Sequence, residues 1–146
     1  MANHVTFRAN FEQINKAALA KLKDLYSRFQ DSNCNFGDMF VDDKEGSPTY
    51  EETNSRSWYN ENVGAKWCYL EEYDDDYLFG TSAWAAPEAG LQWLADQLGE
   101  LDPNLLMNVS FEDEGPNFVG WMVFDGTELW DVGFEEDEDV KNIVSR

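Results

Sequence analysis

The chain has 146 residues, 42% hydrophobic and 15% aromatic, and it carries 30 Asp and Glu against 10 Lys and Arg, a net charge of −20 at pH 7. This charge excludes proteins that hold nucleic acid or anionic membranes by long-range attraction, and it favours basic protein surfaces as partners. The aromatic content excludes a disordered acidic chain, because it allows enough apolar burial to offset the entropy of folding, and the length fits one domain.

The first strand and the first helix are predicted from apolar spacing. Residues 3–10 alternate apolar and polar side chains, the period that turns one face of a strand inward. Residues 12–30 repeat apolar side chains every three or four positions, which predicts a helix. Its solvent-facing side is basic and contains Lys16, Lys21, Lys23 and Arg28. This basic side is either solvated, in local contact with nucleic acid, or neutralised by acids elsewhere in the chain or in a second copy, which would form a homodimer.

Residues 31–64 lose the periodic pattern. They contain Gly, Pro and many acids, together with five aromatic residues: Phe36, Phe40, Tyr50, Trp58 and Tyr59. A structureless connection of this length is unusual in a compact domain. We therefore expect an irregular insertion with one or two short helices, which its aromatic side chains hold to the core.

The second half of the chain predicts strands around one helix. Residues 65–73 and 77–85 are expected to form a hairpin with a turn at Asp74–Asp76. Pro87 opens a helix that ends near Gly99, since proline is tolerated at a first helical position. Further strands are predicted over 105–113, 117–125 and 128–132.

The order of strand, helix, insertion, strand, strand, helix, strand and strand is typical of the split βαβ pattern. It predicts the α+β class, with a ferredoxin-like antiparallel sheet and two helices on one face. We expect one domain over residues 1–134, including the insertion at 31–64, and an acidic C-terminal extension over 135–146 that is either frayed or a short helix.

Several stretches resemble the small ferredoxin-like proteins encoded by phages and conjugative plasmids, the YubB-type family. Residues 60–67 (NENVGAKW) are similar to the most recognisable segment of that family, although Val63 stands where Trp is usual. The other similar stretches are Asn3–Thr6, Thr81–Pro87 and Phe118–Trp121. The resemblance implies a ferredoxin-like fold and a mobile-element gene product that acts on host machinery, and it implies no catalytic residues.

Carboxylates are the candidate partner-binding groups. Residues two apart on a strand lie about 6.6–6.8 Å apart on one face. Glu112 and Glu114 have this spacing, as do Glu72 and Asp74 if the strand continues. Such rows could imitate the phosphates of a nucleic acid, or they could be a solubility coat. The acidic candidates are Glu71, Glu72, Asp74, Asp75, Asp76, Glu112, Asp113, Glu114, Glu135, Glu136, Asp137, Glu138 and Asp139.

The tryptophans divide into two groups. Trp67, Trp84 and Trp93 are expected in the core. Trp58, in the insertion, and Trp130, near the tail, are better candidates for exposed interface anchors.

Catalytic, metal and cofactor sites are not predicted. The segment that contains Gly46 resembles a Ca²⁺ loop but has Val41 at the first ligand position and Pro48 inside. Cys34, Cys68 and His4 offer only one thiol–imidazole combination, and two cysteines with one histidine cannot complete a structural zinc site. The cysteines are expected to be free thiols, since no signal peptide or membrane span is recognised and a reducing cytoplasm is therefore expected.

The sequence thus predicts a cytoplasmic, non-enzymatic phage or mobile-element accessory protein. It would bind and inhibit a basic host protein that handles nucleic acid, by nucleic-acid mimicry and as part of an anti-defence function, without contacting nucleic acid or membrane itself. The alternative is an accessory or assembly protein whose acidity is a solubility coat and which contacts its partner through exposed aromatics. An enzyme stays a third hypothesis.

Overall fold

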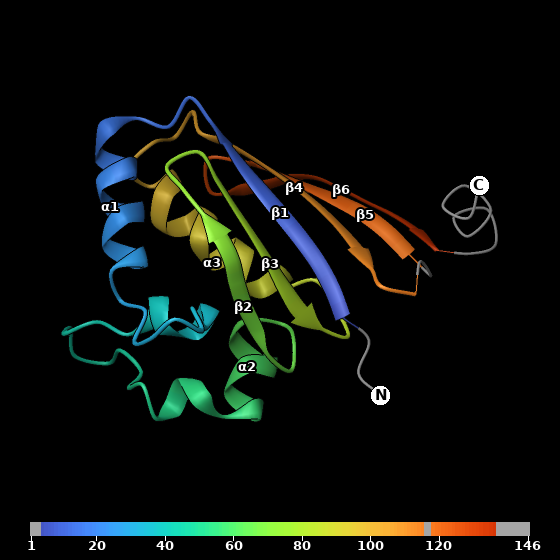
Figure 1. Cartoon of the computed structure of the whole chain (residues 1–146). Helices are drawn as coiled ribbons and strands as arrows, with labels where there is room; N and C mark the ends of the chain where they lie inside the picture. Colours follow the sequence, from blue (N-terminus) through green and yellow to red (C-terminus); the bar gives the residue numbers. More distant parts are fainter. Residues whose placement is uncertain (1–3, 116–117, 137–146) are drawn as a thin grey trace.

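The computed structural model describes residues 4–115 and 118–136. Six antiparallel strands form one open sheet in the order β2-β3-β1-β4-β5-β6, and helices α1 and α3 lie against one of its faces (Figure 1). The strands are β1 (His4–Glu12), β2 (Cys68–Tyr73), β3 (Tyr77–Ala83), β4 (Leu106–Asp113), β5 (Phe118–Asp125) and β6 (Glu128–Glu136). The helices are α1 (Lys16–Tyr26), α2 (Arg56–Asn62) and α3 (Glu88–Gly99), with short 3₁₀ turns η1 (Phe36–Phe40) and η2 (Glu52–Asn54). The predicted α+β class with an antiparallel sheet is confirmed, and the sheet has more strands than the four of the expected core.

Strand β1 lies at the centre of the sheet, and its side chains alternate between the two faces of the sheet. It pairs with β3 on one side and with β4 on the other. Its inward side chains are all buried: Val5, Phe7, Ala9 and Phe11. Leu22 and Leu25 of α1 and Leu91, Leu94 and Leu98 of α3 are fully buried in the same core. The side chains of β1 that lie between these buried residues face away from the helices, so the second face of the sheet is left open.

The start of α1 differs from the prediction. Glu12 is the last residue of β1, and Gln13 has a positive φ of 57°. Asn15 then caps the helix, since its side-chain oxygen accepts a hydrogen bond from the Ala18 N–H at 2.8 Å. The apolar spacing starts before this cap, which is why the sequence placed the helix start at residue 12.

A buried carboxylate ties the two covering helices together. Asp102, which follows α3, is 5% exposed and accepts a hydrogen bond from the Asn15 N–H at 2.8 Å. In return, the Asn15 side chain donates to the Leu101 carbonyl at 2.9 Å. The first bond satisfies the backbone N–H of the α1 cap, and the second satisfies a carbonyl that follows the last turn of α3.

The insertion is ordered and contributes to the core. Phe36, Met39 and Tyr59 are buried, and the Tyr59 hydroxyl accepts a hydrogen bond from the Gly37 N–H at 3.0 Å. Phe40 stacks on Trp93 of α3 with ring centroids 3.8 Å apart. Short helices held down by aromatic side chains are therefore confirmed for this segment.

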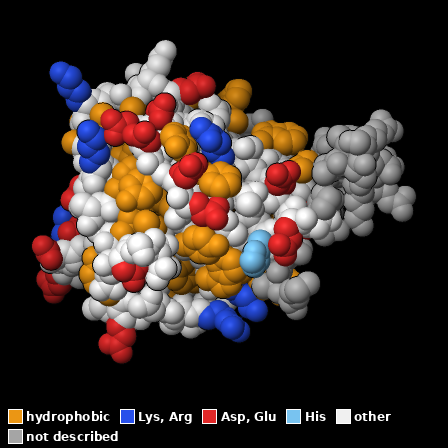
Figure 2. Space-filling view, in the orientation of Figure 1, with side chains coloured by type: hydrophobic (Ala, Val, Ile, Leu, Met, Phe, Trp, Pro, Cys, Tyr) orange, Lys and Arg blue, Asp and Glu red, His pale blue; other side chains and the backbone are white. Residues whose placement is uncertain are grey.

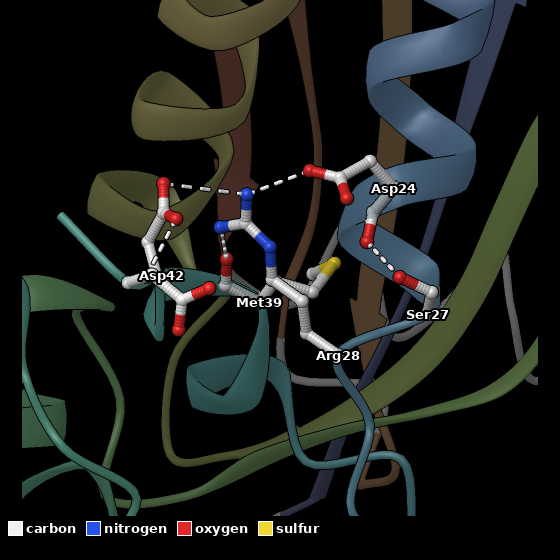
Figure 3. Close-up of polar contacts among 6 residues, drawn as sticks. Asp24, Ser27, Arg28, Met39 and Asp42 are labelled. Carbon is white, nitrogen blue, oxygen red and sulfur yellow. Dashed lines mark hydrogen bonds and ion pairs between the residues drawn. The ribbon is translucent and has the colours of Figure 1, made fainter.

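Arg28 joins α1 to the insertion (Figure 3). Its guanidinium donates to the Met39 carbonyl at 2.8 Å and to Asp24 at 2.7 Å, and it lies 3.5 Å from Asp42. The hydrogen bond from the Asp43 N–H lowers the pKa of the Asp42 carboxyl, and the Arg28 charge lowers it further. Part of the basic side of α1 thus neutralises acids of the same chain, one of the alternatives that the sequence left open.

Two predictions about the sequence's later part are wrong. Trp84 is not in the core: it is 50% exposed and has a positive φ of 73°, which apolar alternation does not reveal. Strand β6 does not end at residue 132 but continues to Glu136, because β5 offers pairing partners as far as Phe118. Glu135 and Glu136 therefore pair with β5 rather than starting a separate tail, and Asp137, Glu138 and Asp139 lie outside the described residues.

We predict that Asp102→Ala lowers the free energy of unfolding by about 1–3 kcal/mol, because it removes the buried carboxylate that accepts the part-buried hydrogen bond of the Asn15 N–H. Asp102→Asn keeps an acceptor oxygen and should cost less. Urea denaturation of the two variants measures the difference. Equal losses for both would show that the hydrogen bond to Asn15 does not hold the helices.

Candidate functional site

The first group of predicted acids lies at the turn between β2 and β3. We call Asp74, Asp75 and Asp76 the Asp turn; all three are exposed. The turn lies beside the end of β1, since the Phe11 N–H donates to the Asp76 carbonyl at 2.8 Å. The Tyr26 hydroxyl donates to the Asp74 carbonyl at 3.1 Å, and burial together with the Asp74 charge raises the pKa of this phenol.

A second group lies at the opposite end of the sheet. We call Glu112 and Glu114 the Glu end; both are exposed. Glu112 lies opposite Thr6 of β1, and the Glu114 side chain accepts a hydrogen bond from the His4 N–H at 3.2 Å. The Glu114 carboxylate is also 3.8 Å from His4 Nδ1, which makes an ion pair when the imidazole is protonated.

Asp113, between these two residues, is not available to a partner. It lies opposite Val5, on the face that the helices cover, and is 3% exposed. Its side chain accepts a hydrogen bond from the Phe118 N–H at 3.1 Å. Its assignment as a partner-binding residue is therefore wrong, because strand alternation turns it inward while Glu112 and Glu114 turn out.

The acids do not form one continuous row. The Asp turn lies beside Phe11 and the Glu end beside His4, so a rise of about 3.3 Å per residue along β1 puts them about 23 Å apart. Glu72 lies opposite Phe79, between the two ends. An irregularity between Leu70 and Glu72 and the end of β2 at Tyr73 remove the regular spacing considered for Glu72 and Asp74. Glu71 is exposed and accepts a hydrogen bond from the Thr81 hydroxyl at 3.2 Å.

The register of β6 places Glu135 and Glu136 near the Glu end. Glu135 lies opposite Val119, and Val119 lies opposite Glu112 on its other side. Two strand spacings, about 10 Å, therefore separate Glu112 and Glu135 in one row across the sheet. Glu136 follows opposite Phe118.

An open face connects the two acidic groups. Arg8 lies near its centre, with its guanidinium 4.4 Å from the centroid of the Tyr77 ring, and its Nε donates to Asn10 at 3.1 Å. A shallow hollow of about 400 Å³ lies beside it, lined in part by Thr6, Arg8, Phe79, Ser110, Glu112 and Val119. Figure 2 shows this side of the molecule, where apolar side chains alternate with acidic and basic ones.

Sequence reasoning did not single out the open face. Two signals could have found it: the alternation of Tyr77 and Phe79 with Leu78 and Gly80 in β3, and the placement of Arg8 among the outward positions of β1. Both signals need the strand pairing before they converge, because Arg8 lies opposite Phe79 only once β1 and β3 are known to be neighbours.

The predicted aromatic anchors have different outcomes. Trp130 is 71% exposed, in agreement with its assignment. Trp58 is partly buried against the core, with its ring edge-on to Phe40 at 4.9 Å, so its assignment as an exposed anchor is wrong. The insertion folds its aromatics inward because they complete the core under α3. Trp84 takes the exposed position instead, with the Lys66 ammonium 5.3 Å from its ring centroid.

The described residues give little support for a reactive thiol or for a metal-binding site. Both Cys34 and Cys68 are free there, and burial raises the pKa of each thiol, which disfavours the thiolate needed for nucleophilic attack. His4 contacts Trp67 edge-on at 5.2 Å. Within residues 4–115 and 118–136, no three His, Cys, Asp or Glu side chains come together to hold a metal ion.

Asp38 is a buried carboxyl in η1, 2% exposed. Burial raises its pKa, and the hydrogen bond from the Gln30 N–H at 3.1 Å partly opposes this. The carboxyl thus serves as an acceptor for the chain that follows α1, which is a structural role.

We predict that Asp38→Asn raises the free energy of unfolding at neutral pH. The amide keeps an acceptor for Gln30 and removes a buried charge. Because the folded-state pKa lies above the ordinary value of 3.8, the charge costs stability only above that value, so the gain should disappear below it. Urea denaturation above and below this pH measures the effect, and a gain of equal size at both would contradict this origin.

No family model matches the chain, and no curated protein matches it significantly. The resemblance to the YubB-type family therefore stays a prediction. Among the described residues, none of the helices is long and apolar enough to cross a bilayer.

Proposed function

We propose that this chain is a non-enzymatic accessory protein that binds and inhibits a basic, nucleic-acid-binding host protein. The observation that carries the proposal is the placement of exposed carboxylates at both ends of one open sheet face. In the described part of the chain, ion pairs engage the carboxylates of Asp24, Asp42, Asp75 and Glu114, and none is formed there by Asp74, Asp76 or Glu112. The other acids of the Asp turn and Glu112 therefore remain available to an external cation.

The spacing of the two acidic groups supports nucleic-acid mimicry. Duplex DNA carries one negative charge per about 1.7 Å of axis, and a basic groove that follows it holds cations along its length. Two acidic groups about 23 Å apart match two separated phosphate-binding positions in such a groove better than one unbroken row of phosphates. The open face between them, with its shallow hollow, would cover the middle of the groove.

The connectivity supports a ferredoxin-like arrangement for the first four strands. Strands β2-β3-β1-β4 are adjacent in that order, and α1 and α3 provide the two crossovers. Strands β5 and β6 would extend this unit as a C-terminal hairpin. The origin in a phage or mobile element, the anti-defence role and the cytoplasmic location rest on the sequence resemblance and composition.

A second candidate is an assembly protein that binds through exposed aromatics. Its supporting observation is Trp130, 71% exposed on the outer strand. In this case the acids would serve solubility, and Trp130→Ala would weaken binding more than neutralising the acids would.

The proposal predicts that neutralising the acidic ends weakens binding to a protein captured from host lysate at low salt. Asp74→Asn, Asp75→Asn, Asp76→Asn and Glu112→Gln together should weaken affinity at least tenfold and reduce its salt dependence, since fewer counterions are exchanged. Isothermal titration over a salt series measures both quantities.

A matched variant controls for net charge. Asp43→Asn, Glu45→Gln, Glu51→Gln and Glu61→Gln remove the same charge from exposed positions of the insertion. This variant should bind nearly as the unmodified chain does. If both variants lose the same affinity, only the total charge matters and the acidity is a coat.

A further inference from the structure

The outer edge of the sheet at β6 is unpaired in the described part of the chain. Eight of its nine residues pair with β5 and none pairs with another described strand, so the backbone groups directed away from β5 lack a strand partner. The opposite edge is different, because the Leu70 N–H donates to the Cys34 carbonyl at 2.9 Å and Asn35 forms a bridge with Tyr69. The insertion thus covers part of the β2 edge, whereas β6 is an open template for another strand.

Exposed apolar side chains line this edge. Leu129 is 37% exposed, Trp130 71% and Val132 53%. The register shifts between Val123 and Phe124, so that Asp131 lies opposite Val123 and Leu129 opposite Phe124. Trp130 is the additional residue of this bulge, and bulges redirect side chains at sheet edges. An aromatic side chain in this position is a typical anchor for a bound segment.

The charge of β6 favours a basic strand over a second copy of this chain at the outer edge of the sheet. The strand contains Glu128, Asp131, Glu135 and Glu136 and no Lys or Arg. A second copy paired edge to edge would bring like charges opposite one another, which destabilises a strand pair. A basic strand would bring opposite charges together in the same register, so the same acids that repel a second copy attract a basic segment.

We propose that β6 binds an extended, basic segment of the partner protein, which adds a strand to the sheet. Backbone hydrogen bonds to the outer edge would supply affinity, Trp130 would anchor the segment, and the acids of β6 would select basic side chains. This inference rests on the proposed function in taking the partner to be basic, and it adds a contact at the edge of the sheet to those at its acidic ends.

The probe that tests it is a blocked synthetic peptide of alternating Lys and Val, titrated into the full chain and followed by amide hydrogen exchange in NMR. We expect slowed exchange at β6 amides. The same peptide N-methylated throughout keeps its charge but loses its donors, and it should bind about tenfold more weakly. Trp130→Ala should weaken binding severalfold, whereas Trp84→Ala, at an exposed tryptophan away from the edge, should not.

Three results would overturn strand addition: no binding of the peptide, equal binding of the N-methylated peptide, or changes confined to the Asp turn and the Glu end. The acidic-end variant separates this inference from the proposed function. If that variant no longer binds the captured host protein and the peptide does not bind at the β6 edge, the proposed function stands and the strand addition fails. If the peptide protects β6 but neutralising the acidic ends leaves capture unchanged, the reverse holds.

Discussion

The structure depends on the central position of β1. Its pairing with β3 and β4 commits four alternate side chains to the core and turns the intervening ones to the open face. The same register fixes where the acids lie, because the turn after β2 meets one end of β1 and the end of β4 meets the other. A chain of charge −20 can fold this way because its described acids lie mainly at turns and strand ends, where water solvates them.

The few buried acids have a different function from the exposed ones. Asp102, Asp113 and Asp38 each accept a hydrogen bond from a backbone N–H, of Asn15, Phe118 and Gln30 respectively. They stabilise junctions between elements. The two classes look alike in the sequence, and only the register and the helix ends separate acids that hold the fold from acids that could meet a partner.

Much of the fold was predictable because it follows from local patterns. Alternation located the strands, and three-and-four spacing located α1 and α3. The sequence could not show that Gln13 and Trp84 take left-handed backbone conformations, since nothing in their neighbours requires a positive φ. It also could not show the burial of Asp113 or the separation of the acids into two groups, because both depend on which strands are neighbours. Phe36, Phe40 and Tyr59 of the insertion were correctly assigned to the core, whereas Trp58, which was expected outside, packs against it.

Nucleic-acid mimicry requires that the chain occupy the nucleic-acid site of its partner. The direct test is native mass spectrometry of the captured partner with the chain and a duplex DNA or RNA that the partner binds. Mimicry predicts two mutually exclusive complexes, each displaced as the other ligand is added. A stable ternary complex of partner, nucleic acid and chain would contradict it.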